Sequence, residues 1–467
     1  MENRLAKSYR NRILFITCLS SSLVPFMGSS VNLALPHIAR EFQMSGIEQS
    51  WVLTAYLLST AILQVPFGRL ADIWGKRTVF LTGICIFAVT TFCCGFAFNG
   101  LTLIILRTLQ GIGSAMMFCT NIAILSSVFP PKERGMAMGV NAATVYVSIA
   151  AGPSLGGIIT QYLGWGYVFF ITAGVSAIAL TGALIVMKDR WRESKGEPFD
   201  VKGAVIYGFS VLALIYGLSI LPQIAGFALI ALSALLLFLF VRHERRETYP
   251  VFNVNLFIHN KIFRMSSAAA LINYAATFPI GFLMSLYLQE VKGLDARSAG
   301  LILIVQPIIQ SVLSPIAGKL SDRIPARFIA SFGMALITGS LLILAFFITA
   351  NSSLIFLLVM LGLLGVGFAA FSSPNTNAIM GSVDKKNYSM ASATTGTVRL
   401  VGQAFSMGIT TMIISIVIGA QAITPAVSVL LMTVIHLTFI IFAALCAFGV
   451  YTSLARGNSR DESLNIK

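Results

Sequence analysis

GRLADIWGKR at residues 68–77 recurs in altered form as GKLSDRIPAR at residues 318–327. The two segments share Gly, Leu, Asp and Arg at their first, third, fifth and tenth positions, and each has a basic residue second. Each follows a long apolar run. The sequence therefore indicates two related halves with equivalent turns.

Apolar runs fill the chain around these turns. Of 467 residues, 57% are hydrophobic and 10% are charged, and the mean hydropathy is +0.86. Soluble domains carry roughly a quarter charged residues, whereas about 20 apolar residues cross a bilayer as a helix. We predict an all-α integral membrane protein with fourteen transmembrane helices. The runs lie near residues 13–35, 50–70, 78–97, 101–127, 136–161, 167–187, 202–221, 224–241, 263–288, 298–318, 328–349, 353–380, 388–418 and 427–453.

The first run, 13–35, follows the basic segment MENRLAKSYRNR. It is longer than the apolar core of a cleaved signal peptide, so we expect a retained spanning helix. Links such as FNG at 98–100 leave no room for a soluble domain. All six cysteines lie in apolar stretches without histidine partners, so we expect neither a disulfide framework nor a metal site.

Basic residues concentrate in alternate loops. With a cytoplasmic N-terminus, the inner segments hold 27 of the 32 Lys and Arg residues, and the outer ones hold only Arg40, Lys292 and Arg297. Cytoplasmic loops carry such an excess. The net charge of +15 then reflects orientation in the cell membrane with both termini inside, and we expect no nucleic-acid partner.

The repeated turns divide the spans into two pseudo-symmetric six-helix bundles joined by two extra linking helices. We predict an N-terminal bundle at 1–190, a two-helix insertion at 191–260 and a C-terminal bundle at 261–467. Parallel repeats of this kind build secondary transporters whose bundles rock about a midplane site.

Two arginines, Arg107 and Arg399, fall inside predicted helices. Arginine at the bilayer centre costs about 2.5–3.5 kcal/mol on insertion scales, so such residues face the bundle interior and mark functional sites. The alternative is that helix carbonyls satisfy them and that they hold the bundle together.

GPSLGG at 152–157 places Gly152, Pro153, Gly156 and Gly157 in the middle of the fifth helix. Proline removes a backbone hydrogen bond, and glycine lets a neighbouring backbone approach. We predict a kinked, tightly packed segment; ordinary packing of small residues is the alternative.

Taken in order, these motifs resemble the major facilitator superfamily, and specifically its fourteen-helix drug:proton antiporter branch. Residues 68–77 look like the signature loop between helices two and three. RTLQGIGSA at 107–115 is similar to the helix-four motif, and GPSLGG to the helix-five motif. VNLALPHIA at 31–39 and LYLQEVKGLDARSAGL at 286–301 resemble further patterns of this branch. The resemblance implies a secondary transporter that exports drug-like or amphipathic molecules by alternating access, with proton antiport as the default.

The resemblance also implies that the repeated turns form a gate that locks the outward-facing state. Asp72 can accept hydrogen bonds from Arg77 or from a facing helix N-terminus. The alternative is that these charges only orient the chain. The gate residues are Gly68, Arg69, Asp72, Gly75 and Arg77 in the first copy and Gly318, Asp322 and Arg327 in the second.

One position departs from the branch. Met27 stands where these antiporters usually carry Asp in helix one, and none of the 17 acidic residues falls within a predicted helix interior. Arginine does not titrate in proteins. Three possibilities stay open: proton coupling through Glu290, Glu48 or His37 at outer helix ends, transport of an anion by a cationic cavity, or uncoupled facilitation. His37 also fits an interfacial histidine.

A central cavity is expected to collect the polar residues of the spans, although amides on different helices can instead bond to one another. Aromatic residues such as Tyr56, Tyr146, Tyr274 and Phe278 are candidates for an apolar drug site. The predicted cavity or coupling residues are Arg107, Arg399, Asn32, Asn273, Gln306, Gln310, Asn375, Asn377 and Glu290.

Other classes of function fit less well. His243 and His259 lie in basic, loop-like runs without catalytic spacing, and no phosphate-binding GxxxxGK[ST] loop is present. We therefore expect no enzyme, no ATP-driven pump and no cofactor. A non-transporting receptor or scaffold is the remaining alternative. The expected partners of a monomeric chain are a small-molecule substrate, membrane lipids and protons.

Overall fold

The computed structural model describes every residue except 1, 45, 190, 295, 420–426 and 457–467. Within the described residues all regular elements are helices, and fourteen helical segments are long and apolar enough to cross a membrane. The predicted fold class is therefore confirmed. Large apolar side chains such as Phe98, 76% exposed, and Ile224, 87% exposed, cover the outside, as expected of a surface that faces lipid.

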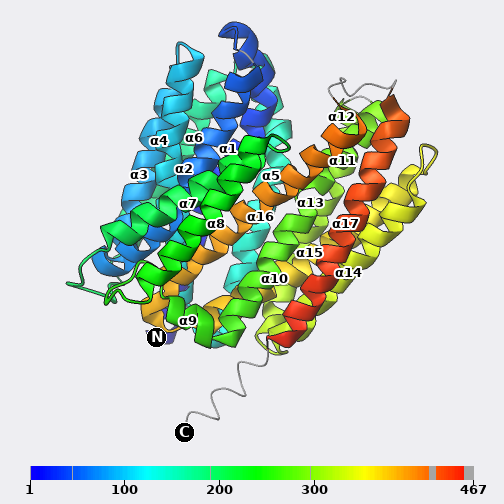
Figure 1. Cartoon of the computed structure of the whole chain (residues 1–467). Helices are drawn as coiled ribbons and strands as arrows, with labels where there is room; N and C mark the ends of the chain where they lie inside the picture. Colours follow the sequence, from blue (N-terminus) through cyan, green and yellow to red (C-terminus); the bar gives the residue numbers. More distant parts are fainter. Residues whose placement is uncertain (1, 45, 190, 295, 420–426, 457–467) are drawn as a thin grey trace.

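The helices form two groups and a hairpin (Figure 1). The first group is α1 (Glu2–Glu41), α2 (Gly46–Trp74), α3 (Lys76–Cys94), α4 (Gly100–Val128), α5 (Pro131–Tyr162) and α6 (Gly166–Val186). The hairpin is α7 (Val201–Ser219) and α8 (Ile224–Glu244). The second group is α9 (Val254–His259), α10 (Lys261–Thr277), α11 (Pro279–Leu286), η1 (Tyr287–Val291), α12 (Ala296–Leu303), α13 (Val305–Ser321), α14 (Ala326–Phe347), α15 (Leu354–Gly381), η2 (Lys385–Asn387), α16 (Tyr388–Val417) and α17 (Ser428–Ala455).

Local sequence sets several helix starts. The Asn99 side chain accepts a hydrogen bond from the Thr102 backbone at 2.7 Å and so caps α4, and Ser353 caps α15 in the same way. Gly75 alone separates α2 from α3, with a φ of 103°. Because only glycine adopts this conformation without strain, the turn between α2 and α3 depends on Gly75.

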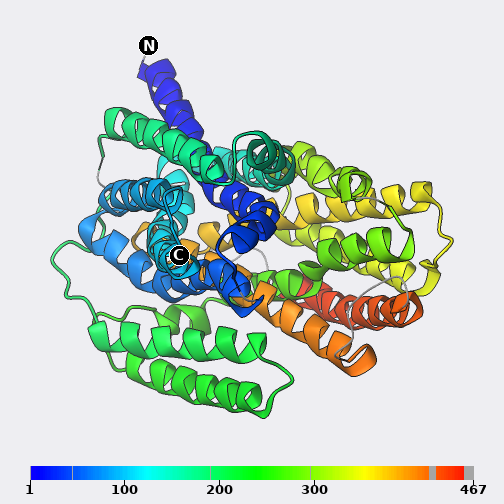
Figure 2. The same cartoon turned by 90° about the horizontal axis from the view of Figure 1, so that it is seen from above.

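Each six-helix group has its own apolar core. One cluster includes Val24, Phe80 and Phe169 of the first group, and another includes Met334 and Phe439 of the second. The hairpin packs beside both groups: Tyr207 and Phe240 share a cluster with residues of α2, α3, α4 and α16. Figure 2 shows the hairpin at one edge of the two groups.

The repeated turns lie on one face of the molecule. We call this the basic face; it carries the α2–α3 turn, the α13–α14 turn, α9 and the start of α1 (Figure 1). The helices that follow the symmetric pattern meet there: α2 packs against α16, and α13 packs against α5. Helix two of each half thus contacts helix five of the other, as a duplicated bundle requires.

Candidate functional site

A cavity of about 80 Å³ lies between the two six-helix groups. Its walls come from α2, α4 and α5 on one side and from α10, α15 and α16 on the other. Sites for drug-sized ligands occupy about 300–1,000 Å³, so the halves must move apart to admit such a molecule. The lining residues are Gln64, Phe118, Ile122, Met138, Asn141, Ala142, Val145, Tyr146, Tyr274, Ser372, Ser373, Thr376, Ser392, Thr395, Gly396 and Arg399.

Arg399 supplies the positive charge of this cavity. It lies in α16, its side chain is partly exposed, and its guanidinium stands 4.6 Å from the centre of the Phe118 ring in α4. A cation over an aromatic face is favourable. Arg399 therefore joins the two halves and remains able to meet a ligand. Tyr146 and Tyr274 line the same space, and the Tyr146 hydroxyl lies 3.4 Å from Ser372 Oγ.

Gln64 lines the cavity without a hydrogen-bond partner. Gln64 is fully buried in α2, and neither its Nε2 nor its Oε1 has a hydrogen-bond partner. Its side-chain amide packs directly against Gly396 of α16. A buried amide without a partner costs about 1–3 kcal/mol. Gln64 is not among the predicted cavity residues, because the sequence does not show in which direction a single glutamine in an apolar run points.

Asn141 brings a second polar group to the cavity wall. Its Oδ1 accepts a hydrogen bond from Ser21 Oγ at 2.8 Å, and Asn121 Nδ2 donates to Ser21 and to the Thr17 carbonyl. This network ties α1, α4 and α5 together beside the site. Asn121 and Asn141 were also missed in the sequence.

Arg107 lies away from the cavity, inside the first group. It is 1% exposed; its Nε donates to the Val52 carbonyl at 3.1 Å, and its Nη1 donates to Gln110. Its guanidinium stands 4.2 Å from the Tyr56 ring centre. These contacts correspond to the alternative in which a buried arginine holds the bundle together.

The other predicted cavity residues are scattered. Asn273 faces the Met334 sulfur, Gln306 donates to Gln310 in the same helix at 3.1 Å, and Glu290 is partly buried in η1. The side chains of Asn32, His37 and Glu48 lie outside the described residues.

Asn375 and Asn377 lie toward the basic face. Asn375 Oδ1 accepts from the fully buried Arg456 at 2.8 Å, whereas Asn377 Nδ2 donates to Ser321 at 3.0 Å. Arg456 follows the last residue of α17, beyond the predicted span 427–453, yet its side chain is buried.

Asp322 connects the second repeated turn to the other half. Its Oδ1 accepts from the Gly135 backbone N–H at 2.9 Å, and its Oδ2 accepts from that of Met136 at 3.2 Å. A Cβ on Gly135 would lie 2.4 Å from the Gly318 carbonyl oxygen, so both glycines are needed for this approach. The contact joins α13 to α5 at the basic face.

The first repeated turn makes the matching contact on α16, where a Cβ on Gly68 would lie 2.8 Å from Ala393 Cβ. Asp72 is buried, and its nearest cation is Lys76 at 3.7 Å. Arg77 donates instead to the Met187 carbonyl. Of the two donors predicted for Asp72, Arg77 or a facing helix N-terminus, Arg77 is directed to another partner.

Two further arginines of the predicted gate make local contacts. Arg69 pairs with Glu197 at 2.5 Å and donates to Ser194, in the segment that follows α6. Arg327 stacks 4.7 Å from the Phe328 ring centre.

The helix-five motif packs against α1. Ser30 Oγ donates to the Gly152 carbonyl at 3.0 Å, and a Cβ on Gly156 would lie 2.7 Å from Ser30 Cβ. Gly157 is partly buried, and the side chain of Pro153 lies outside the described residues. The close packing is present in α5, which runs as one helix from Pro131 to Tyr162.

Residues 17–407 and 266–465 match the sequence profile of the Major Facilitator Superfamily. The chain belongs to the Major Facilitator Superfamily. It is 29% identical to the riboflavin transporter RibZ of Clostridioides difficile over 85% of this chain and 86% of that protein. It is also 29% identical to multidrug resistance protein Stp of Mycobacterium tuberculosis over 85% of this chain and 75% of that protein.

The crystal structure of the human organic anion transporter MFSD10 has the same fold. Its TM-score is 0.63 at 13% identity, over 97% of this chain and 99% of that one. Together with the fourteen candidate spans, these matches confirm the fourteen-helix branch of the Major Facilitator Superfamily. The chain is a multi-pass secondary transporter and not an enzyme.

Proposed function

We propose that this transporter exports amphipathic, drug-like small molecules with aromatic parts by alternating access about the central cavity. The observation that carries the proposal is the lining: Phe118, Tyr146 and Tyr274 offer ring faces, and Gln64 and Arg399 offer polar groups. Stacking and a few convergent polar atoms are what small-molecule sites use for orientation. The relatives named for riboflavin transport and multidrug resistance support this substrate class.

The proposed cycle uses the predicted units 1–190, 191–260 and 261–467. The first and last rock against each other, with the basic face in the cytoplasm, both termini inside and a monomeric chain in the cell membrane. In the conformation described here, the contacts at Asp322 and Gly68 hold the basic face closed. Parting them opens the cavity to the cytoplasm, so these two contacts are proposed as the gate.

Proton antiport is the branch default, and a second candidate function has its own support. Met27 is fully buried in the core of the first group, and the described lining of the cavity contains one arginine and no carboxylate. A cationic cavity favours a negatively charged substrate. The second candidate is therefore organic-anion transport. The anion's own gradient and charge drive this transport, or the protein is an uncoupled facilitator.

Proteoliposome uptake tests these proposals. The purified chain is reconstituted, and a panel of labelled neutral, cationic and anionic aromatic compounds is offered with and without an imposed pH gradient. Drug export by antiport predicts uptake that rises with the gradient. Indifference to the gradient, together with anion uptake that lipophilic cations do not inhibit, supports the second candidate. If no compound crosses faster than in protein-free vesicles, the remaining reading is a receptor or scaffold.

A further inference from the structure

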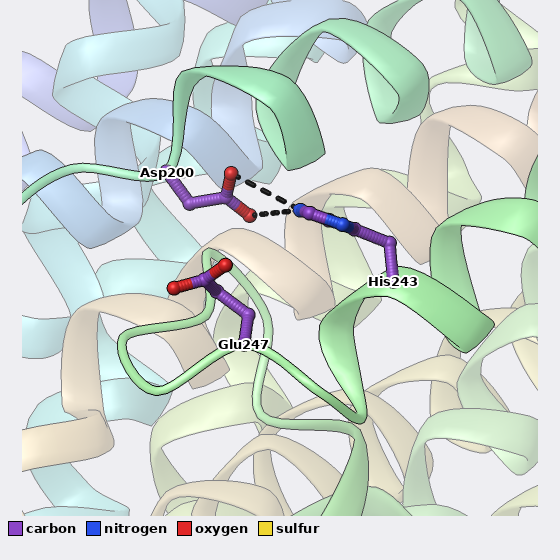
Figure 3. Close-up of side chains that lie close together, drawn as sticks. All are labelled: Asp200, His243 and Glu247. Carbon is purple, nitrogen blue, oxygen red and sulfur yellow. Dashed lines mark hydrogen bonds and ion pairs between the residues drawn. The ribbon is translucent and has the colours of Figure 1, made fainter.

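Four chemically reactive side chains meet at the basic-face end of the inserted hairpin. Asp200 caps the start of α7, since its Oδ1 accepts from the Gly203 backbone at 2.9 Å. His243 and Glu244 end α8, and Glu247 follows three residues later. Figure 3 shows Asp200, His243 and Glu247 directed toward one another from α7, α8 and the loop after α8.

The ligand atoms are close enough to share one ion. His243 Nε2 lies 3.2 Å from Asp200 Oδ1 and 3.1 Å from Asp200 Oδ2. One ligand atom each from Asp200, His243 and Glu247 can be chosen so that all lie within 4.8 Å of one another. The Asp200 side chain is 6% exposed and the His243 side chain 20%, so the group is shielded from bulk water.

Glu244 gives an independent observation that points to a cation. It is 3% exposed; its Oε2 accepts from the Phe252 backbone at 2.9 Å, but its buried Oε1 has no partner. That oxygen and Asp200 Oδ2 both lie 2.2 Å from the point that a Cβ on Gly203 would occupy. An unpaired carboxylate oxygen thus faces the Asp200 carboxylate across a gap that exists because residue 203 is glycine.

The charge here is unbalanced. The neighbouring cations Lys202, Arg242, Arg245 and Arg246 are exposed, and among the described residues the ion pairs of this cluster involve only His243. Buried charges are normally paired or bind a metal.

We propose that Asp200, His243 and Glu247 bind one divalent transition-metal ion such as Zn²⁺, with the Glu244 carboxylate beside Asp200 adding negative charge to the site. Zn²⁺ takes imidazole nitrogen and carboxylate oxygen in four-coordinate sites, whereas Mg²⁺ and Ca²⁺ prefer oxygen alone. The site lies outside the transport cavity and does not depend on the proposed substrate.

Such an ion fastens three segments of the insertion: the start of α7, the end of α8 and, through Glu247, the loop that follows α8. The hairpin contacts both halves, because Tyr207 Oη lies 3.5 Å from the Ala61 carbonyl of α2 and 3.2 Å from Thr397 Oγ1 of α16. The metal therefore acts as a structural clamp on a hairpin that bridges moving helices.

The test uses the full chain, purified in detergent through a tag without histidines and stripped with EDTA. ZnCl₂ alone is added, and the excess is removed by desalting. Mass spectrometry then gives the number of zinc ions bound per chain, and the thermal unfolding temperature is measured on the same sample. We expect one zinc per chain and a higher unfolding temperature that EDTA reverses. His243→Ala and Glu247→Gln are expected to weaken zinc binding at least tenfold. Gly203→Ala is expected to do the same, because its Cβ displaces the Asp200 carboxylate although every ligand residue is kept.

His436→Gln is the matched control. His436 lies in α17, away from the hairpin, and its Nε2 forms a hydrogen bond with the Ile348 carbonyl. It is expected to bind zinc like the parent. Zinc bound equally well by His243→Ala and Glu247→Gln, or no zinc bound at all, overturns the proposal. Equal stabilisation by MgCl₂ overturns the assignment to a nitrogen-liganded transition metal. The unfolding temperature without metal identifies any variant that fails to fold, and Glu247→Gln, the mildest change, then decides.

Discussion

Asp322 of one half accepts two hydrogen bonds from the backbone of the other, 2.9 Å from the Gly135 nitrogen and 3.2 Å from that of Met136. Two helices that belong to separate bundles are thus joined through backbone N–H donors, and Arg134 adds an electrostatic attraction to Asp322. The contact therefore depends on the position of a single carboxyl group, that of Asp322.

The closed basic face is expected to respond to pH through Asp322. Burial raises the pKa of this carboxyl and outweighs the Gly135 and Met136 N–H groups, which lower it. When the gate opens, the side chain returns to water and to an ordinary pKa of about 3.9. The closed state then binds the proton more tightly, so its extra stability is full below the ordinary pKa and is lost as pH rises through the raised one.

Acidification is therefore expected to populate the closed basic face. Spin labels are attached to cysteines that replace Lys132 and Arg323, both exposed, in an otherwise cysteine-free chain. Pulsed electron paramagnetic resonance then measures the distance between the two labels across the basic face. Asp322→Asn is expected to flatten the pH response, whereas Asp384→Asn, an exposed acid on the same face, leaves it intact. An unchanged response in Asp322→Asn contradicts the assignment.

Gly139→Leu is expected to hold the basic face open. A Cβ at this position would lie 2.5 Å from the Ser314 carbonyl oxygen of α13. This oxygen belongs to a packed backbone and cannot move aside. Overpacking of this kind costs about 1–3 kcal/mol, so the ratio of closed to open molecules falls roughly tenfold in the same label experiment. Gly174→Leu is the control, because nothing lies within 4 Å of a Cβ there. Normal closure in Gly139→Leu would show that the basic face closes without close packing of α5 against α13.

Arg107→Lys is expected to destabilise the chain by about 2–3 kcal/mol, because lysine cannot reproduce bonds to Val52 and Gln110 together with stacking on Tyr56. Thermal unfolding in detergent measures the loss, with the exposed Arg323→Lys as control. If Arg107→Lys unfolds like the parent but stops transport, Arg107 acts in the transport cycle rather than in packing.

Arg399→Gln is expected to reduce kcat/KM for anionic compounds at least tenfold and to change that for neutral ones little. Its guanidinium faces the cavity, and hydrogen bonds to a charged group are worth about 1.5–3 kcal/mol. Arg399→Lys keeps the charge and is expected to restore part of the anion transport in proteoliposomes. An equal loss for neutral and anionic compounds counts against charge recognition.

Gln64→Leu is expected to stabilise the chain by about 1 kcal/mol and to raise KM for polar substrates, because it removes an unpaired buried amide. Thermal unfolding and uptake kinetics measure the two effects. Gln289→Leu is the comparison, since Gln289 Nε2 already donates to Ser285 Oγ at 2.9 Å and its loss brings no such relief. A destabilised Gln64→Leu would mean that Gln64 has a partner in the membrane.

The sequence was most informative where local pattern is sufficient. Runs of apolar residues gave the fourteen spans, and Gly75 marked a one-residue turn. The site was harder to predict. Arg107 and Arg399 look alike in sequence, yet one is bonded inside a bundle and the other faces the cavity. Asp200 and His243 are 43 positions apart, and only the antiparallel hairpin brings them together.

The sequence alone determined that this chain crosses a membrane many times, that it is built from two related halves, and that its basic loops share one side. These follow from hydropathy and charge, which act on each segment separately. Tertiary structure decided which polar residues meet, since that depends on the rotation of each helix about its axis and on how the halves close. The direction of Gln64, the bonds of Asp322 and the cluster at the hairpin end all result from packing between helices distant in the chain.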